Sequence, residues 1–316
     1  MPSPCNRPEV RPTRRGVICL LAAALGLASV TAHARPASRR FTRRSPMTTA
    51  PRAQDITDHG ALGDGQSDDT AALQAAVDEC QAAGGGTVRA PPGLYRIATV
   101  RLCSNLTLHL EPGADVFDPE GEAGMRGPHA VLGYNSRDVA IRGVTIRDAA
   151  NDAMLMLYCD GVDCDGVSVR GGWDGFHIRG SADTPSRRAT FTNCRFFTGE
   201  DAIAGHYTDD LLVRGCVLNS SCNAIRWLGP GRRMRVDTCL MFGPGRFPHR
   251  KAAPDAEVDE PGRGVRGLPV WGLYARRVES LTLDNVTLDC RDNDPRAALR
   301  IEDVADFDDA GLRLPT

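Results

Sequence analysis

Short segments with apolar residues at alternating positions recur along the chain from residue 152 onward. Six of them align when they are written under one another: DAMLML from 152, DGFHIR from 174, DAIAGH from 201, NAIRWL from 223, WGLYAR from 271 and AALRIE from 297. The first four begin 22, 27 and 22 residues apart. Alternation with a period of two predicts β-strands buried on one face, and a repeat of this length predicts a solenoid.

A second set of segments keeps step with the first. Its members are VAIRGVTI from 139, VDCDGVSV from 162, ATFTNCRF from 189, LLVRGCVL from 211, MRVDTCLM from 234 and LTLDNVTL from 281. Each has alternating apolar residues, a polar or glycine-containing pair and further apolar residues, which predicts a strand, a bend and a second strand. Coils of about 22 residues built in this way predict an all-β fold, a single-stranded right-handed parallel β-helix.

The interval of 48 residues between the segments at 223 and 271 is longer than the others. We expect two coils there, interrupted by the Gly-, Pro- and Arg-rich stretch GPGRFPHRKAAPDAEVDEPGRGVRG. In the second set, Cys194, Cys216 and Cys239 occupy one column beside valines, and no histidine shares it. We therefore expect an inward stack of small apolar side chains there rather than a metal site.

The stretch SDDTAALQAAVDECQAAGGG, from residue 67, predicts an α-helix. Ser67 and Asp68 are residue types that cap helix N-termini, Leu73 and Val77 lie four positions apart, and the glycines end the helix. One end of a solenoid exposes unpaired strand edges and apolar core. We expect this amphipathic helix to cover the N-terminal end, and the stretches TVRAPPGLYRI and NLTLHLEPGADV to form the first strands.

Residues 1–34 have the pattern of a signal peptide. Arg14 and Arg15 precede the apolar run VICLLAAALGLASV, and the small-residue pattern AHA ends at Ala34. The apolar run is shorter than the roughly 20 residues that a membrane-spanning helix needs. We therefore expect a secreted or periplasmic protein, cleaved near Ala34, with no membrane anchor.

Residues 35–53 are rich in Arg, Pro, Ser and Thr and poor in apolar residues, which predicts a disordered linker. The β-helix domain then spans 54–316. A translation start at Met47 is the alternative, and it would remove the argument for export.

The composition adds a few limits. A net charge of -2 gives no reason to expect a nucleic-acid partner, and we expect a monomer. Of the 11 cysteines, Cys5 and Cys19 lie in the leader, and the rest are irregularly spaced with no CxxC pair. This spacing favours buried thiols over a disulfide framework.

The stretch from 55 to 116 carries the most specific resemblance. DITDHGALGDGQSDDTAALQAAVDECQAAGGGTVRAPPGLYRI and SNLTLHLEPGADV resemble the opening of the pectate-lyase-like superfamily, especially the polygalacturonase-type glycoside hydrolases of family 28. The resemblance implies a parallel β-helix that acts on a polysaccharide. Hydrolases, lyases and epimerases share this opening, so the reaction must be inferred from other residues.

Family 28 enzymes carry four signatures on successive coils: Asn-Thr-Asp-Gly, Gly-Asp-Asp, Gly-His-Gly and Arg-Ile-Lys. Here GWDG at 172–175 stands at the first signature and GED at 199–201 at the second. SCNA at 221–224 falls where the histidine segment is expected, and FPHRK at 247–251 lies near the fourth without a clean match. By position, the resemblance carries over three catalytic carboxylates: Asp174, Glu200 and Asp201.

The resemblance implies an inverting glycoside hydrolase that needs no cofactor or metal. Glu200 would protonate the leaving oxygen, and Asp174 with Asp201 would hold the attacking water. Adjacent carboxylates repel each other, which raises one pKa, as a general acid requires. Carboxyl groups about 6.5–9.5 Å apart leave room for the water of an inverting reaction.

Strands of neighbouring coils lie about 4.8 Å apart, so residues of one column form a ladder. The first ladder comprises Asp152, Asp174, Asp201 and Asn223. Alternation turns the side chains of Phe176, Ile178, Ile203, Gly205, Ile225 and Trp227 inward. It turns those of His177, Arg179, Ala204, His206, Ala224 and Arg226 outward, and we expect the acids to face this outer surface from the bend before each strand.

Several of these residues are candidates for binding sugar hydroxyls or a uronate carboxylate, for which the arginine fork is suited. They are His177, Arg179, His206, Asn223, Arg226 and, on the insertion, His249 and Arg250. Simpler interpretations stay open: Asn223 and Asp152 as ladder residues that bond the backbone, the two histidines of the strands as a solvated surface, and His249 with Arg250 as loop.

Two other functions stay open. In a polysaccharide lyase, stacked acids beside Arg226 would form a calcium cluster next to a base, although calcium prefers six to eight oxygen ligands. The other is a β-helix that binds glycan without catalysis, which the missing histidine signature favours. The partner in every case is a polysaccharide or oligosaccharide.

Overall fold

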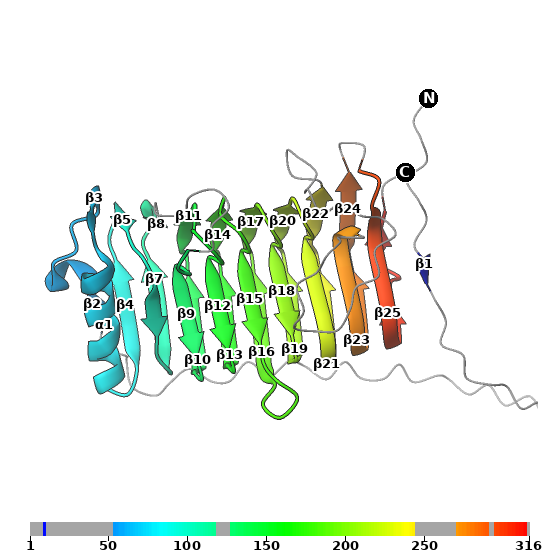
Figure 1. The fold of residues 1–316 in the computed structure, drawn as a ribbon, viewed down its shortest axis with the longest axis horizontal. Coiled ribbons are helices and arrows are strands. Elements are labelled where there is room, and N and C mark those ends of the chain that lie inside the picture. Colours follow the sequence, from blue (N-terminus) through cyan, green and yellow to red (C-terminus); the bar gives the residue numbers. More distant parts are fainter. Residues whose placement is uncertain (1–8, 11–52, 118–126, 244–269, 291–293, 315–316) are drawn as a thin grey trace, which may run out of the picture.

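The computed structural model describes residues 9–10, 53–117, 127–243, 270–290 and 294–314. These residues form a solenoid whose coils follow one another along a single axis in chain order (Figure 1). Strands of successive coils pair in parallel, for example Phe176 with Ile203 and Ile203 with Ile225. The predicted fold class, a single-stranded parallel β-helix with an N-terminal helix, is confirmed.

Each central coil contributes three strands, one to each of three faces. The first face consists of β6 (Val100–Leu102), β9 (Val131–Tyr134), β12 (Met154–Leu157), β15 (Phe176–Arg179), β18 (Ile203–His206) and the opening parts of β21 (Ile225–Asp237), β23 (Val270–Asp284) and β25 (Ala297–Asp308). From β12 onward, these strands are the first set of segments in the sequence repeat.

The second face consists of β2 (Ala53–Asp55), β4 (Gly86–Ala90), β7 (Leu106–Leu110), β10 (Arg137–Arg142), β13 (Asp160–Asp165), β16 (Ser186–Thr192), β19 (Thr208–Arg214) and the later parts of β21, β23 and β25. The third consists of β3 (Asp64–Asp68), β5 (Gly93–Arg96), β8 (Ala114–Phe117), β11 (Thr145–Arg147), β14 (Ser168–Arg170), β17 (Arg195–Thr198), β20 (Val217–Ser220), β22 (Leu240–Gly243), β24 (Val286–Cys290) and β26 (Leu312–Arg313). A two-residue strand, β1 (Glu9–Val10), pairs with β25.

The bend between the second and third faces has the same cause in every central coil. One residue at this corner takes a positive φ, a conformation that Gly and Asn adopt with little strain. The corner residues are Gly143, Gly166, Asn193, Gly215, Thr238 and Asn285. The predicted strand, bend and strand of the second set are therefore confirmed.

The interval between the segments at 223 and 271 holds one coil instead of the two that we predicted. Ile225 pairs directly with Leu273, so β21 and β23 belong to neighbouring coils. Residues 244–269, which lie outside the described residues, account for the extra length. A long insertion and an additional coil add similar numbers of residues, so the spacing alone did not distinguish them.

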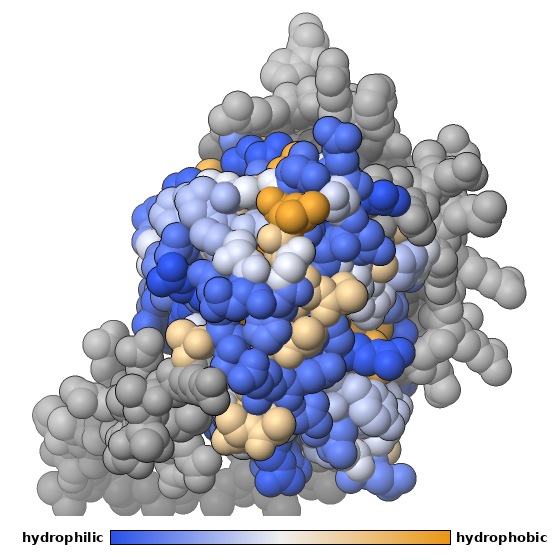
Figure 2. Space-filling model, turned by 90° about the vertical axis from the view of Figure 1, so that its left-hand side faces the viewer, coloured by the Kyte–Doolittle hydropathy of each residue, from blue (hydrophilic) through white to orange (hydrophobic). Residues whose placement is uncertain are grey.

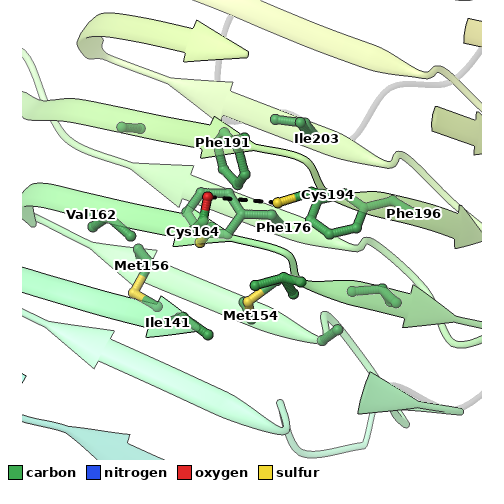
Figure 3. Packing of buried hydrophobic residues seen from close by; sticks show 14 of the residues in the cluster. Ile141, Met154, Met156, Val162, Cys164, Phe176, Phe191, Cys194, Phe196 and Ile203 are labelled. Atoms are coloured by element: carbon green, nitrogen blue, oxygen red, sulfur yellow. Dashed lines mark hydrogen bonds between the residues drawn. The ribbon is translucent and has the colours of Figure 1, made fainter. Parts of the chain in front are cut away.

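The core is a continuous column of apolar side chains inside the coils (Figure 3). Phe191 packs edge to face on Phe176, with ring centroids 4.6 Å apart, and also contacts Phe196. Cys194 lies beside these rings, and its thiol donates a hydrogen bond to the carbonyl of Cys164 at 3.7 Å. The predicted inward cysteine column is confirmed, because Cys194, Cys216 and Cys239 are all buried free thiols.

Gly205 is required by the packing of the next coil. A Cβ atom at this position would lie 2.3 Å from the indole ring of Trp227, which fills the space. Both residues point inward, as alternation predicted, and Trp227 is 1% exposed. The absence of a side chain at Gly205 therefore leaves the space in which the next coil buries the indole of Trp227.

Helix α1 (Thr70–Ala82) covers the N-terminal end of the solenoid, as expected. It buries Leu73 and Val77 against the strands of the first coils, and the Asp68 carboxylate accepts a hydrogen bond from the backbone N–H of Thr70 at 2.9 Å. A short 3-10 helix, η1 (Ile56–His59), precedes it. Figure 2 shows that this end presents a mostly hydrophilic surface, as a terminal cap of a solenoid requires.

In the parts of the chain that the structure describes, there is no helix both long and apolar enough to cross a bilayer. The predicted signal peptide, the linker and the domain boundary at residue 54 stay predictions, because only Glu9–Val10 is described before Ala53.

Candidate active site

The carboxylates of Asp174 and Asp201 form successive rungs of a hydrogen-bonded ladder under the first face. Asp174 Oδ1 accepts a hydrogen bond from the backbone N–H of Asp201 at 2.9 Å, and Asp201 Oδ1 accepts one from that of Asn223 at 3.1 Å. Each acid therefore uses one oxygen to fix the bend of the next coil. The second oxygen of each contacts a side chain of the first face, so both carboxylates are directed toward that face although they are buried.

Asp174 and His177 form a buried pair at the beginning of β15. Asp174 Oδ2 lies 3.0 Å from His177 Nδ1, and Arg179 Nε donates a hydrogen bond to His177 Nε2 at 3.0 Å. Since Nε2 accepts a hydrogen bond, a neutral imidazole must carry its proton on Nδ1, from which it can donate to Asp174. Arg179 Nη2 also lies 3.1 Å from His177 Nδ1, so the guanidinium spans both ring nitrogens while Asp174 faces Nδ1.

The titration of this pair agrees with that assignment. Burial lowers the pKa of His177 to about 4, and the charges of Arg179 and Arg226 act in the same direction against the opposing effect of Asp174. Burial alone raises the pKa of Asp174, but its hydrogen bond with His177 and the charge of Arg226 outweigh it, so the pKa lies below its ordinary value. At neutral pH, Asp174 is a carboxylate and His177 is uncharged.

Asp201 is the most deeply buried acid of the site, with 1% of its surface exposed. Its Oδ2 accepts a hydrogen bond from Arg226 Nε, and Arg226 belongs to β21 of the next coil. Burial raises the pKa of Asp201 to about 7; Arg226 opposes this shift, while the neighbouring carboxylates Asp174 and Glu200 add to it. Asp201 therefore titrates close to neutral pH.

Glu200 lies half-buried beside Asp201 in the turn between β17 and β18. Its backbone carbonyl accepts hydrogen bonds from the hydroxyls of Thr198 and Ser220, the first at 2.8 Å. Its carboxylate Oε2 lies 3.4 Å from the Sγ of Cys222. Cys222 is fully buried, and burial together with the nearby carboxylates raises the pKa of its thiol, so the sulfur carries a proton that it can donate.

A buried ion pair anchors the turn that carries Cys222. Arg296 and Asp294 are paired at 2.7 Å with no exposed side-chain surface, although Arg296 comes from the segment before β25. The guanidinium also donates hydrogen bonds to the carbonyl of Cys222 at 2.9 Å and to that of Val270 at 3.2 Å. The last coil thereby fixes the backbone next to Glu200.

His206 lies one coil along from His177 on the first face. The two imidazole rings stack with centroids 5.5 Å apart. Burial lowers the pKa of His206 to about 3, with His177, Arg226 and Arg179 adding to the shift. Within the described part of the chain, no group hydrogen-bonds the buried His206 Nδ1, so a neutral imidazole with a vacant nitrogen stands at the edge of the carboxylate cluster.

The structure thus brings together seven of the predicted site residues, on three neighbouring coils. They are Asp174, His177, Arg179, Glu200, Asp201, His206 and Arg226. Arg179 is exposed, whereas Arg226 is only 13% exposed at its side chain. The predicted residues His249 and Arg250 lie outside the described residues.

Asn223 has the ladder role that was the alternative to substrate binding. It is 1% exposed, and its side-chain amide donates a hydrogen bond to the carbonyl of Val270. The expectation that Ala224 points outward is wrong, because Ala224 belongs to the apolar core; Ala204 and His177, also expected on the outer surface, are 0% and 3% exposed. Ile225 and Trp227 occupy the inward positions of β21, so the outward residue of this coil is Arg226.

Asp152, Asp174 and His177 offer donor atoms within 4.8 Å of one another. The set suits calcium poorly, because calcium takes six to eight oxygen ligands and here one of three donors is a nitrogen. Asp174 and His177 are also within hydrogen-bonding distance of each other. Asp152 has a second imidazole beside it, with His129 Nδ1 at 3.4 Å from its Oδ2. These three residues therefore do not fit a calcium site.

The sequence reasoning missed Cys222, Asp294 and Arg296. Cys222 could have been predicted as a site residue, because it belongs to SCNA, the segment that stands in place of the histidine signature. Asp294 and Arg296 gave no signal, because a buried arginine in a loop before a strand looks in sequence like a surface residue.

The comparisons with known proteins agree on the fold and on a carbohydrate context. The sequence model of a family described as "Rhamnogalacturonase A/epimerase, pectate lyase-like" matches residues 53–113. Mannuronan C5-epimerase AlgE3 of Azotobacter vinelandii is 65% identical over 43 residues, which are 14% of this chain and 2% of that protein. Mannuronan C5-epimerase AlgE4 of the same organism is 36% identical over 130 residues, 40% of this chain and 22% of that protein.

An exo-poly-α-D-galacturonosidase of Dickeya chrysanthemi is 31% identical over 90 residues, 28% of this chain and 15% of that protein. The chain thus spans well under two thirds of these curated relatives, which are carbohydrate-active enzymes.

Two solved structures share the fold. A family 28 exopolygalacturonase of Yersinia enterocolitica has a TM-score of 0.50 at 12% identity, covering 84% of this chain and 77% of that chain. The surface adhesin PfbA of Streptococcus pneumoniae has a TM-score of 0.51 at 13% identity, covering 84% and 92%. The predicted resemblance to pectate-lyase-like β-helix proteins is therefore confirmed.

Proposed function

We propose that this parallel β-helix protein, which resembles the pectate-lyase-like superfamily, is a secreted glycoside hydrolase that degrades a pectic or other acidic polysaccharide. The observation that carries the proposal is the cluster of Asp174, Glu200 and Asp201 on two adjacent coils, bordered by basic side chains of the first face. Two or more carboxyl groups in different environments are what glycosidic hydrolysis requires.

Glu200 acts as the general acid. Its carboxyl group, held by the Cys222 thiol, gives its proton to the glycosidic oxygen as the bond to the anomeric carbon breaks. A water held by Asp174 and Asp201 attacks the anomeric carbon from the opposite side, and its proton passes to one of these carboxylates. Attack opposite to the leaving group inverts the configuration, in the manner of polygalacturonases.

The basic residues of the first face bind the acidic sugar. Arg179 is exposed, and its guanidinium suits the two oxygens of a uronate carboxylate. The half-buried imidazole of His206 lies next to Arg179 in the same row. Arg226 lies deeper and is paired with Asp201, so it adjusts that carboxyl group more than it contacts substrate.

We infer one second candidate, abstraction of the C5 proton of a uronate, as in a lyase or an epimerase. The observation that favours it is His177, a buried neutral imidazole between Asp174 and Arg179, which would accept a proton at Nε2 once its hydrogen bond from Arg179 opens. The matches to mannuronan C5-epimerases point in the same direction. A lyase would then transfer a proton to the departing oxygen, and an epimerase would return one to the opposite face of the sugar.

A screen of pectic, alginate and other acidic polysaccharides separates these functions. The proposed hydrolase produces new reducing ends without ultraviolet absorbance, and a chelator does not affect it. Absorbance from an unsaturated sugar would identify a lyase, and a changed C5 configuration in uncut polymer would identify an epimerase. Binding without any change in the glycan would leave the non-catalytic alternative.

A further inference from the structure

Two tyrosines form an exposed pair on the first face, away from the acids. Tyr134, at the end of β9, is 64% exposed, and Tyr158, directly after β12, is 37% exposed. Their rings meet edge to face with centroids 5.9 Å apart. Most of the aromatic side chains that the structure describes are buried or half-buried, so an exposed pair of rings stands out as a candidate contact surface.

Tyr134 stands in the same outward row as Arg179 and His206, and Tyr158 directly follows the residue of this row in β12. Tyr134 registers with Leu157, Leu157 with Arg179, and Arg179 with His206. Tyr134 is therefore two coils before Arg179, a separation of about 10 Å along the axis at the usual strand spacing. A chain molecule lying along this row would touch both places.

Tyr134 lines two hollows of the surface. One hollow, of about 420 Å³, is lined by Arg101, Leu102, Leu132 and Tyr134. The other, of about 350 Å³, includes Tyr134, Asn135, Ser136, Ser104 and Asn105 in its lining. An aromatic face beside both an arginine and several hydroxyl and amide groups matches a sugar ring, which has apolar C–H faces and polar edges.

Arg101 supplies a positive charge at the start of this surface. Arg101 lies in β6 and pairs with Leu132 of β9. The side chain of Gln74, in α1, makes hydrogen bonds with the backbone N–H and carbonyl of Arg101. No carboxylate of the described residues pairs with its guanidinium. A uronate carboxylate is therefore a matching partner for it.

From this placement we propose that Tyr134, Tyr158 and Arg101 form a binding subsite for an acidic sugar, at which the glycan is held two coils away from the carboxylates. The occupant is the same acidic glycan that is the proposed substrate, so this inference rests on the proposed function for the identity of the ligand. The subsite binds long chains that reach both places, and short ones bind at the acids without it.

The test measures binding to the Glu200→Gln variant, which does not cleave, by calorimetry with acidic oligosaccharides of increasing length taken from the screen. Adding Tyr134→Ala is expected to weaken binding of long oligosaccharides about tenfold. Binding of mono- and disaccharides is expected to stay unchanged. Tyr134→Phe keeps the ring and should retain the affinity, and Arg101→Gln should weaken binding of uronate oligosaccharides but not of their carboxyl-reduced forms.

Phe197→Ala is the matched control. Phe197 is 38% exposed and also packs edge to face on another aromatic ring, Phe242, but it belongs to β17 of the third face. Its loss should leave binding unchanged at every length. Equal effects of Phe197→Ala and Tyr134→Ala, or no length dependence for Tyr134→Ala, would overturn the inference.

The outcome is separable from that of the proposed function. If the wild-type protein cleaves no glycan but binds one in a manner that depends on length and on Tyr134, the subsite stands and the hydrolase proposal fails. If the wild-type protein cleaves a glycan and Tyr134→Ala changes neither KM nor binding for long chains, the subsite fails and the hydrolase proposal stands.

Discussion

The Sγ of Cys222 lies 3.4 Å from Oε2 of Glu200, so a protonated, fully buried thiol stands against the proposed general acid. The thiol comes from the coil that follows, in the segment where family 28 enzymes carry their histidine signature. A hydrogen bond from the thiol holds the Oε2 atom of Glu200. We therefore expect Cys222 to position the acid.

Replacing Cys222 should separate this role from simple packing. Cys222→Ala removes the donor and is expected to lower kcat about tenfold with little change in KM, because a misplaced acid affects the transition state. Cys222→Ser restores a donor and should recover most of the rate. The measurement is steady-state kinetics on the substrate found by the screen, with the pH profile of kcat recorded for each variant.

Cys239→Ala is the control for packing. Cys239 is a buried free thiol in the core column, and its hydrogen bonds go to the backbone carbonyls of Val213 and Asp237 rather than to the carboxylates of the candidate site. It should lower the melting temperature about as much as Cys222→Ala and leave kcat unchanged. A Cys222→Ala variant that loses stability but keeps the wild-type kcat and pH profile would show that the thiol does not position Glu200.

The Arg296–Asp294 pair should contribute strongly to stability. Arg296→Met leaves Asp294 as an uncompensated buried charge and removes the hydrogen bonds to the carbonyls of Cys222 and Val270, which is expected to cost about 3–5 kcal/mol of unfolding free energy. Urea denaturation measures this. The control is Arg188→Met, which removes a surface pairing with Asp160 and should cost less than about 1 kcal/mol. Equal losses in the two variants would contradict the anchoring role.

The stability of the protein should fall when the pH drops from 6.5 toward 4. The pKa of His177 is about 4 in the folded protein and near 6.5 in the unfolded chain, so in this range only the unfolded state takes up the proton. Protonation therefore favours unfolding. His206, with a pKa of about 3, acts in the same direction, whereas Asp201, whose pKa is raised to about 7, acts in the opposite one.

His177→Asn removes one of these groups and leaves the other two. The loss of unfolding free energy between pH 6.5 and 4.5 should then be smaller than in the wild type by about 2 kcal/mol. Denaturant titrations at the two pH values measure the difference. Identical losses in wild type and variant would mean that His177 is not held neutral in the folded protein.

The acid limb of the activity profile should report on Asp201. Its pKa is about 7, and the proposed mechanism needs its carboxylate, so kcat is expected to rise with pH through about 7. Arg226 lowers this pKa, so Arg226→Gln should move the limb to higher pH. Arg179→Gln, which removes a nearby arginine that does not contact Asp201, should raise KM and leave the limb in place. A limb that does not move in Arg226→Gln would contradict the assignment.

Much of the fold was predictable from the sequence because one local pattern is repeated. The alternation around Phe176, Ile203 and Ile225 gave the inward residues, and the glycine and asparagine corners gave the bends. The interval before Trp271 was misread, because a long insertion and an extra coil cannot be told apart by length. The strand register shows that β21 and β23 are in neighbouring coils. A single segment of sequence does not determine which strand it pairs with.

The residues of the candidate site could be predicted where they occupy the same position in successive coils. Asp174 and Asp201 follow from the column, and so do His177 and Arg226 on the outer face. Arg296 and the Tyr134–Tyr158 pair did not follow, because their roles depend on contacts across coils or on exposure, neither of which leaves a periodic trace. Asn223 was assigned a contact with substrate, but its burial assigns it to the backbone.

The central claim is that Glu200 donates the proton in hydrolysis of an acidic glycan, and Glu200→Gln tests it most directly. The measurement is the rate of appearance of reducing ends, with ultraviolet absorbance recorded on the same sample. The account predicts that wild type forms reducing ends without absorbance, and that the variant forms none while glycan affinity and melting temperature stay nearly unchanged. A variant with the wild-type rate, or a wild-type product that absorbs in the ultraviolet, would contradict it.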